Sequence, residues 1–125
     1  MDILLDTHIL FWSITQSRKL SARLVEQLES RQNRIWLSAI CLTELNIKER
    51  IGRLTIPDGF ERAVNDLNLE PLPFRADHAA MLGTLELHHR DPFDRMIIAQ
   101  ALVGDMLIAT QDAQFRKYPV KLLKN

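Results

Sequence analysis

Short apolar runs recur along the chain and alternate with longer segments in which apolar residues return every three or four positions. Runs of this length, bounded by polar residues, predict strands. The expected strands are Ile3–Leu5, Ile35–Ser38, Leu69–Phe74, Met106–Thr110 and Val120–Leu123. Strands that alternate with helices predict an α/β protein, here a three-layer α/β/α sandwich around a mostly parallel central sheet.

The segments between these runs have the periodicity of amphipathic helices. In "SARLVEQLESR" the apolar residues share one face, and Ser21 is a suitable N-cap. Further helices are expected over residues 39–52, 59–67 and 76–88. The best-marked helix is "DPFDRMIIAQALVG", with Asp91 as the N-cap, Pro92 at the first helical position and Gly104 just past the end.

Three acidic residues follow predicted strands closely. Asp6 comes directly after the first strand, Asp112 lies two residues after another, and Glu44 lies in the second turn of the helix that follows Ile35–Ser38. Ligands of open α/β sheets bind at the carboxyl ends of the strands, so these three carboxylates are expected at one edge of the sheet. Asp94 follows a helix and a loop, and its distance from that edge is left open by the same reasoning.

Each of these acids also has a purely structural interpretation. Asp6 could cap a helix that begins near His8, and Asp112 could cap a short turn formed by "DAQFRK". Asp94 is the third residue after the N-cap of its helix, where a negative charge favours the free N–H groups. Glu44 is harder to explain as a surface residue, because it is spaced like three apolar residues of the same helix. These are Ile40, Ile47 and Ile51, and the spacing predicts a stripe that faces the interior.

Carboxylates that converge on one site repel each other by roughly 3–4 kcal/mol per close pair at an effective dielectric near 20. A cluster of this kind stays ionised when a cation neutralises it, and oxygen ligands favour Mg²⁺ or Mn²⁺. Zinc would require His or Cys, and the four histidines have no recognisable ligand spacing. His88 and His89 are instead expected at a solvated helix end.

Composition limits the class of protein further. A chain of 125 residues is expected to form one domain, residues 1–125. Sixteen basic and sixteen acidic residues give a formal net charge of zero, so a nucleic acid would have to be held by local basic patches. Cys41 is the only cysteine, which excludes an internal disulfide and suits a reducing cytoplasm. Neither a signal peptide nor a membrane-spanning segment is recognisable, so no membrane partner is expected.

Four motifs, "LLDTHILFW", "SAICLTELNIK", "HRDPFDRMIIAQA" and "LIATQD", together resemble the PIN-domain ribonucleases, and most closely the VapC-type toxins of bacterial toxin–antitoxin pairs. The motifs occur in the family's order and extend over nearly the whole chain. The resemblance places the family's catalytic, metal-binding acids at Asp6, Glu44, Asp94 and Asp112, and leaves Asp91 as a helix cap. It implies hydrolysis of RNA phosphodiester bonds by metal-activated water, with Mg²⁺ or Mn²⁺ as the cofactor.

Further residues and partners follow from the same resemblance. Asp6 and Asp94 are expected to bind the metal most directly, and Arg95, Thr7 and Thr110 are the candidate substrate-binding residues. Arg95 could contact a phosphate or pair with an acid. The expected partners are RNA, a second copy of the chain in a homodimer, and a cognate antitoxin.

Other functions are compatible with some of these features. A PIN-domain RNA-processing nuclease outside toxin–antitoxin systems is the nearest alternative, and a binding module with structural acids is another. A phosphatase of the haloacid-dehalogenase type would need a second Asp two residues after Asp6, where this chain has His8. The Asp and Lys pattern of a receiver domain is absent.

Overall fold

The computed structural model describes all 125 residues and contains one five-stranded sheet. The strands are β1 (Asp2–Leu5), β2 (Arg34–Ser38), β3 (Glu70–Leu72), β4 (Leu107–Thr110) and β5 (Lys121–Lys124). Their order in the sheet is β3-β2-β1-β4-β5, and every neighbouring pair is parallel. The predicted parallel sheet is confirmed, and all five apolar runs overlap an observed strand.

Six α-helices and two 3₁₀ helices connect the strands. They are α1 (Thr7–Thr15), η1 (Ser17–Lys19), α2 (Ala22–Glu29), α3 (Ala39–Arg50), α4 (Phe60–Asp66), α5 (Ala76–Thr84), α6 (Pro92–Gly104) and η2 (Ala113–Lys117). None of the helices combines the length and the apolar character that crossing a bilayer requires.

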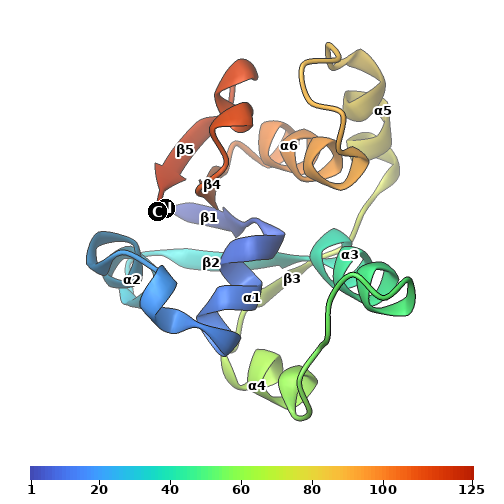
Figure 1. The fold of residues 1–125 in the computed structure, drawn as a ribbon. Coiled ribbons are helices and arrows are strands. Elements are labelled where there is room, and N and C mark those ends of the chain that lie inside the picture. Colours follow the sequence, from blue (N-terminus) through green and yellow to red (C-terminus); the bar gives the residue numbers. More distant parts are fainter.

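The strand order determines which helices cover which face of the sheet. From β1 the chain moves outward through β2 to β3, and then returns past β1 to β4 and β5. Because parallel crossovers are right-handed, helices α1–α4 lie on one face, and α5 and α6 lie on the other. Figure 1 shows α5 and α6 side by side and apart from α1, α2 and α4. The predicted three-layer α/β/α sandwich is therefore confirmed.

The direction of winding reverses between β1 and β4, which are adjacent and in register from Ile3↔Leu107 to Leu5↔Ala109. Connections leave these two strands toward opposite faces, and this opens a crevice at their carboxyl ends. The backbone N–H of Asp6 donates to the Ala109 carbonyl at 3.0 Å, which extends the pairing to the rim of the crevice. The residues that follow β1 and β4 are therefore neighbours.

The core is continuous across both layers of helices. Residues 3–5 of β1 are at most 2% exposed, as expected for a central strand that is covered on both faces. Ile9 and Leu10 of α1 pack on one side and Ile97 and Ile98 of α6 on the other, all with no exposed surface. This packing holds the first turns of α1 and α6 against the ends of the strands.

Only the first half of helix α3 is buried, whereas the sequence predicts an interior face along its whole length. Its buried residues, among them Cys41, Glu44 and Leu45, all lie in its first two turns. Ile47 and Ile51 are 43% and 59% exposed, so their predicted place in the interior stripe is wrong. The helix leaves the core before Ile47, and spacing alone does not show where a helix loses its cover.

Two helix ends also differ from expectation. Helix α5 ends at Thr84 rather than residue 88, and residues 85–91 form an irregular connection to α6. Gly104 is the last residue of α6 instead of the first residue beyond it, and Asp105 takes the left-handed backbone conformation at φ 51°. Asp91 caps α6 as predicted, since its carboxylate accepts from the N–H groups of Phe93 and Asp94.

Candidate active site

Asp6 lies at the junction of β1 and α1 and is 2% exposed. Its Oδ1 accepts from the backbone N–H of Ile9 at 2.9 Å, so Asp6 is the N-cap of α1. Its Oδ2 accepts a hydrogen bond from the Thr110 hydroxyl. Burial nevertheless raises the pKa of Asp6, because two neutral donors replace only part of its lost hydration.

Thr110, the last residue of β4, connects two of the acids. Its hydroxyl donates to Asp6 and accepts from the backbone N–H of Asp112 at 3.0 Å. The carboxylate of Asp112 in turn accepts from the N–H of Gln114 at 2.8 Å and caps η2. Asp6 and Asp112 are thus both helix caps, and one threonine hydroxyl fixes their relative position.

Glu44 is 1% exposed and has two close partners. The Thr7 hydroxyl donates to its Oε1 at 2.6 Å, and the Lys48 ammonium lies 2.5 Å from its Oε2. Lys48 is four residues further along α3, so the pair lies on one face of the helix. The predicted burial of Glu44 is confirmed, and the Lys48 ammonium on the same helix neutralises its charge.

Asp94 is placed at the site by the first turn of α6. The pKa of Asp94 is raised to about 8, chiefly by burial and then by the charges of Asp91, Glu44, Asp6 and Asp112. All four predicted acids are therefore close enough to interact electrostatically. The sequence left the position of Asp94 open, because it depends on how α6 packs against the sheet.

A histidine completes the cluster. The Nε2 atom of His89 lies 3.0 Å from Oδ2 of Asp94 and 3.2 Å from Oδ2 of Asp112. One ligand atom from each of the three side chains lies within 4.8 Å of the others, a spacing that could hold a metal ion. The predicted solvated position of His89 is wrong, since its side chain is only 15% exposed.

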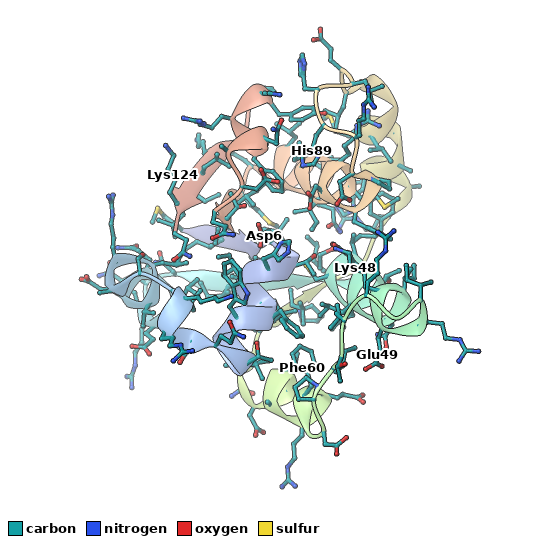
Figure 2. All side chains as sticks on the ribbon, in the orientation of Figure 1. Asp6, Lys48, Glu49, Phe60, His89 and Lys124 are labelled. Atoms are coloured by element: carbon teal, nitrogen blue, oxygen red, sulfur yellow. The ribbon has the colours of Figure 1, made fainter.

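The prediction for His89 is wrong for a structural reason. The helix that was expected to carry it ends at Thr84, and the connection that follows turns back toward η2. His89 stands two residues before the N-cap Asp91, but this spacing does not show that its ring turns toward Asp112. Figure 2 shows His89 beside α6, Asp6 at the end of β1 and Lys48 on α3.

The donor set fits a hard divalent cation. Lys48 neutralises Glu44, so Asp6, Asp94 and Asp112 are the site's uncompensated carboxylates when they are ionised. The raised pKa of Asp94 shows that its negative charge is unfavourable here without a further positive charge. Carboxylate oxygens are the ligands that Mg²⁺ and Mn²⁺ prefer.

The three candidate substrate-binding side chains have partners within the protein. Thr7 and Thr110 donate to Glu44 and Asp6, as described above. The Arg95 Nη2 atom donates to the Leu85 carbonyl at 3.1 Å, and Arg95 forms no salt bridge with an acid. The substrate-binding role of these residues stays a prediction.

Comparison with known proteins assigns the family. The model of the PIN domain matches residues 3–121. No curated protein matches the chain significantly in sequence. Among solved structures, VapBC2 from Rickettsia felis, bound to a DNA fragment from its promoter, aligns with a TM-score of 0.77 and 21% identity. This alignment covers 99% of this chain and 98% of the matched one.

Two further structures align over the same extent, each covering 99% of this chain and 98% of the other. DNA-bound VapBC from Salmonella typhimurium has a TM-score of 0.73 at 20% identity. VapBC-1 from nontypeable Haemophilus influenzae has a TM-score of 0.72 at 23% identity. At these identities the structures support the fold, and the family model covers nearly the whole sequence. The chain belongs to the PIN-domain family.

Proposed function

We propose that this protein is a Mg²⁺-dependent ribonuclease, with Mn²⁺ as an alternative cofactor, and that it is the toxin of a VapBC-type toxin–antitoxin pair in the cytoplasm. The observation that carries the proposal is the acidic cluster at the carboxyl ends of β1 and β4, in which the pKa of Asp94 is raised to about 8. A helix-capping role explains Asp6 and Asp112 individually, but it does not explain why charges from separate elements converge.

The residues proposed to hold the cation are Asp94 and Asp112, together with Asp6 and Glu44. When bound, a divalent cation activates water for attack on the phosphodiester and stabilises the negative charge that develops on the phosphate. The positive charge of the cation also favours the ionised form of Asp94, which burial disfavours.

The chain itself supplies a rigid frame for this chemistry. Asp6 is held by the Ile9 N–H and the Thr110 hydroxyl, and Glu44 by Thr7 and Lys48. These partners fix the orientation of both carboxylates before substrate arrives, which lowers the reorganisation needed during reaction. In this arrangement Asp6 would bind the cation, and Glu44 or Asp112 would position the attacking water.

Two observations support the assignment to a toxin–antitoxin pair. The solved structures that align over nearly the whole chain include VapBC complexes from Rickettsia felis and Salmonella typhimurium, both bound to DNA. In addition, two large apolar side chains are exposed at the C-terminal end of α3, Ile47 and the C-cap Ile51. We propose that a cognate antitoxin and a second copy of this chain cover surfaces of this kind in the complex.

The activity is tested with purified protein that has been separated from any bound partner and refolded. We expect cleavage of RNA in Mg²⁺ or Mn²⁺, and none in excess chelator. Asp94→Asn should lower the rate by at least a hundredfold. Glu86→Gln is the matched control, because Glu86 has an 81% exposed side chain outside the cluster, and this variant should keep full activity.

Cleavage that persists in verified metal-free protein would contradict the proposed mechanism. Intact RNA under all metal conditions, together with tight RNA binding, would instead support a binding module.

A further inference from the structure

The imidazole of His89 is positioned by contacts from a distant part of the chain. The Tyr118 hydroxyl accepts from the backbone N–H groups of His88 and His89 at 3.1 and 2.9 Å. The ring also packs edge-on against Phe115, with 6.0 Å between the centroids. Phe115 is fully buried, so the ring rests on a rigid surface.

The hydrogen bonds of the ring determine its tautomer. The backbone N–H of Asp91 donates to Nδ1 of His89 at 3.1 Å. A ring nitrogen that accepts a hydrogen bond carries a lone pair, so in the neutral imidazole the proton is on the other nitrogen. The proton therefore lies on Nε2, the atom that faces Asp94 and Asp112.

A protonated ring nitrogen has no lone pair to offer a metal ion. Although the spacing of His89, Asp94 and Asp112 suits three metal ligands, the tautomer makes His89 a donor to the two carboxylates. We propose that His89 is a positioning residue of the metal site, whose Nε2–H is shared between Asp94 and Asp112. The metal-positioning part of this proposal rests on the proposed function.

The two carboxylates need such a bridge, because they come from separate elements. Asp94 is in the first turn of α6, and Asp112 lies between β4 and η2. The shared N–H engages Oδ2 of each and holds the two side chains at a fixed separation. It thereby fixes which carboxylate oxygens remain free to bind a cation, the usual effect of hydrogen bonds to metal ligands.

The tautomer is tested first, in metal-free wild-type protein, by ¹⁵N NMR of the histidine rings. His89→Gln and His88→Ala spectra assign the signals. We expect the Nε2–H form for His89, with Nδ1 unprotonated. A His89 ring protonated at Nδ1 alone would overturn the proposal, and this measurement requires neither metal binding nor activity.

The positioning role is tested by calorimetric titration with Mg²⁺. We expect His89→Ala to raise the dissociation constant 10–100-fold, the range typical for loss of a hydrogen bond to a metal ligand. His89→Gln, whose amide can donate from a similar position, should restore it to within a few-fold. Glu86→Gln is the control and should bind as wild type, because the Glu86 side chain is 81% exposed and lies outside the cluster.

Mn²⁺-loaded protein distinguishes a donor from a ligand. Pulsed electron paramagnetic resonance should show no directly bound ¹⁴N in wild type. A strong ¹⁴N coupling that disappears in His89→Ala and survives in His88→Ala would overturn the proposal. An unchanged Mg²⁺ dissociation constant in a folded His89→Ala variant would also overturn it. A wild-type protein that binds no divalent cation would refute the proposed function and the metal-positioning role together, whereas the tautomer result would stand by itself.

Discussion

Replacing Asp94 with Asn tests whether Asp94 is a metal ligand or only stabilises the first turn of α6. In the metal-free protein the pKa of Asp94 is raised to about 8, whereas the reference value for the carboxyl group is 3.8. Between these values the folded protein keeps a proton that the unfolded chain releases. The stability of wild type should therefore fall as the pH rises from about 4 to about 8, and level off above.

The magnitude follows from the size of the shift. Each pH unit corresponds to about 1.4 kcal/mol, so the shift from 3.8 costs wild type about 4 kcal/mol at pH 7. Asn carries no titrating charge and avoids the cost. We therefore expect Asp94→Asn to be more stable than wild type by up to about 4 kcal/mol in chelator at pH 7.

Thermal and denaturant unfolding at pH 5 and pH 7, with chelator or with millimolar Mg²⁺, measure both effects. In chelator the difference between the two proteins should shrink at pH 5. Added Mg²⁺ should stabilise wild type by about 2.7 kcal/mol at a hundredfold excess over its dissociation constant, and the variant far less. Glu86→Gln, the exposed control, should behave as wild type throughout.

Two results would contradict the assignment of Asp94 as a metal ligand. Equal stabilisation of both proteins by Mg²⁺ would remove Asp94 from the metal site. A variant less stable than wild type in chelator at pH 7 would show that Asp94 acts mainly through the first turn of α6, where loss of a charge costs roughly 0.3–1 kcal/mol.

Three other predictions concern the surroundings of the cluster. Thr110→Val removes a hydrogen-bond donor to Asp6 and should lower the free energy of unfolding, measured in urea, by roughly 1.5–3 kcal/mol. Thr110→Ser keeps the hydroxyl and should cost less, and equal losses in the two variants would contradict the bridging role of the hydroxyl. Burial raises the pKa of Cys41 to about 12, so a thiol reagent at pH 8 should react only with unfolded protein, and rapid reaction of the native protein would contradict this. Expression of wild type in cells should arrest growth and expression of Asp6→Asn should not; arrest by the variant would place toxicity elsewhere.

The sequence predicts those features that depend on local pattern and on the geometry of parallel sheets. Asp6 and Asp112 could be placed together because both follow strands, and parallel strands end at one edge. The burial of Glu44 was also predictable, since it lies on the apolar face of the first turns of α3. These inferences needed only the helical period and the direction of the strands.

Other features depend on tertiary contacts that the sequence pattern does not contain. His89 reaches the cluster because α5 ends early and the hydroxyl of Tyr118, almost thirty residues later, holds the connection to α6. The exposure of Ile47 was unpredictable for a related reason, because helical periodicity does not show where the neighbouring layer ends. The pairing of Lys48 with Glu44 follows a familiar helical spacing and could have been predicted.

We propose that the clustered acids Asp6, Glu44, Asp94 and Asp112 bind a divalent cation. Crystals of the protein grown with millimolar Mn²⁺, measured at the manganese absorption edge, test it most directly. We expect an anomalous peak about 2.2 Å from carboxylate oxygens of Asp94 and of at least one other acid of the cluster. No peak near Asp6, Glu44, Asp94 or Asp112 at a Mn²⁺ concentration that supports RNA cleavage would contradict it.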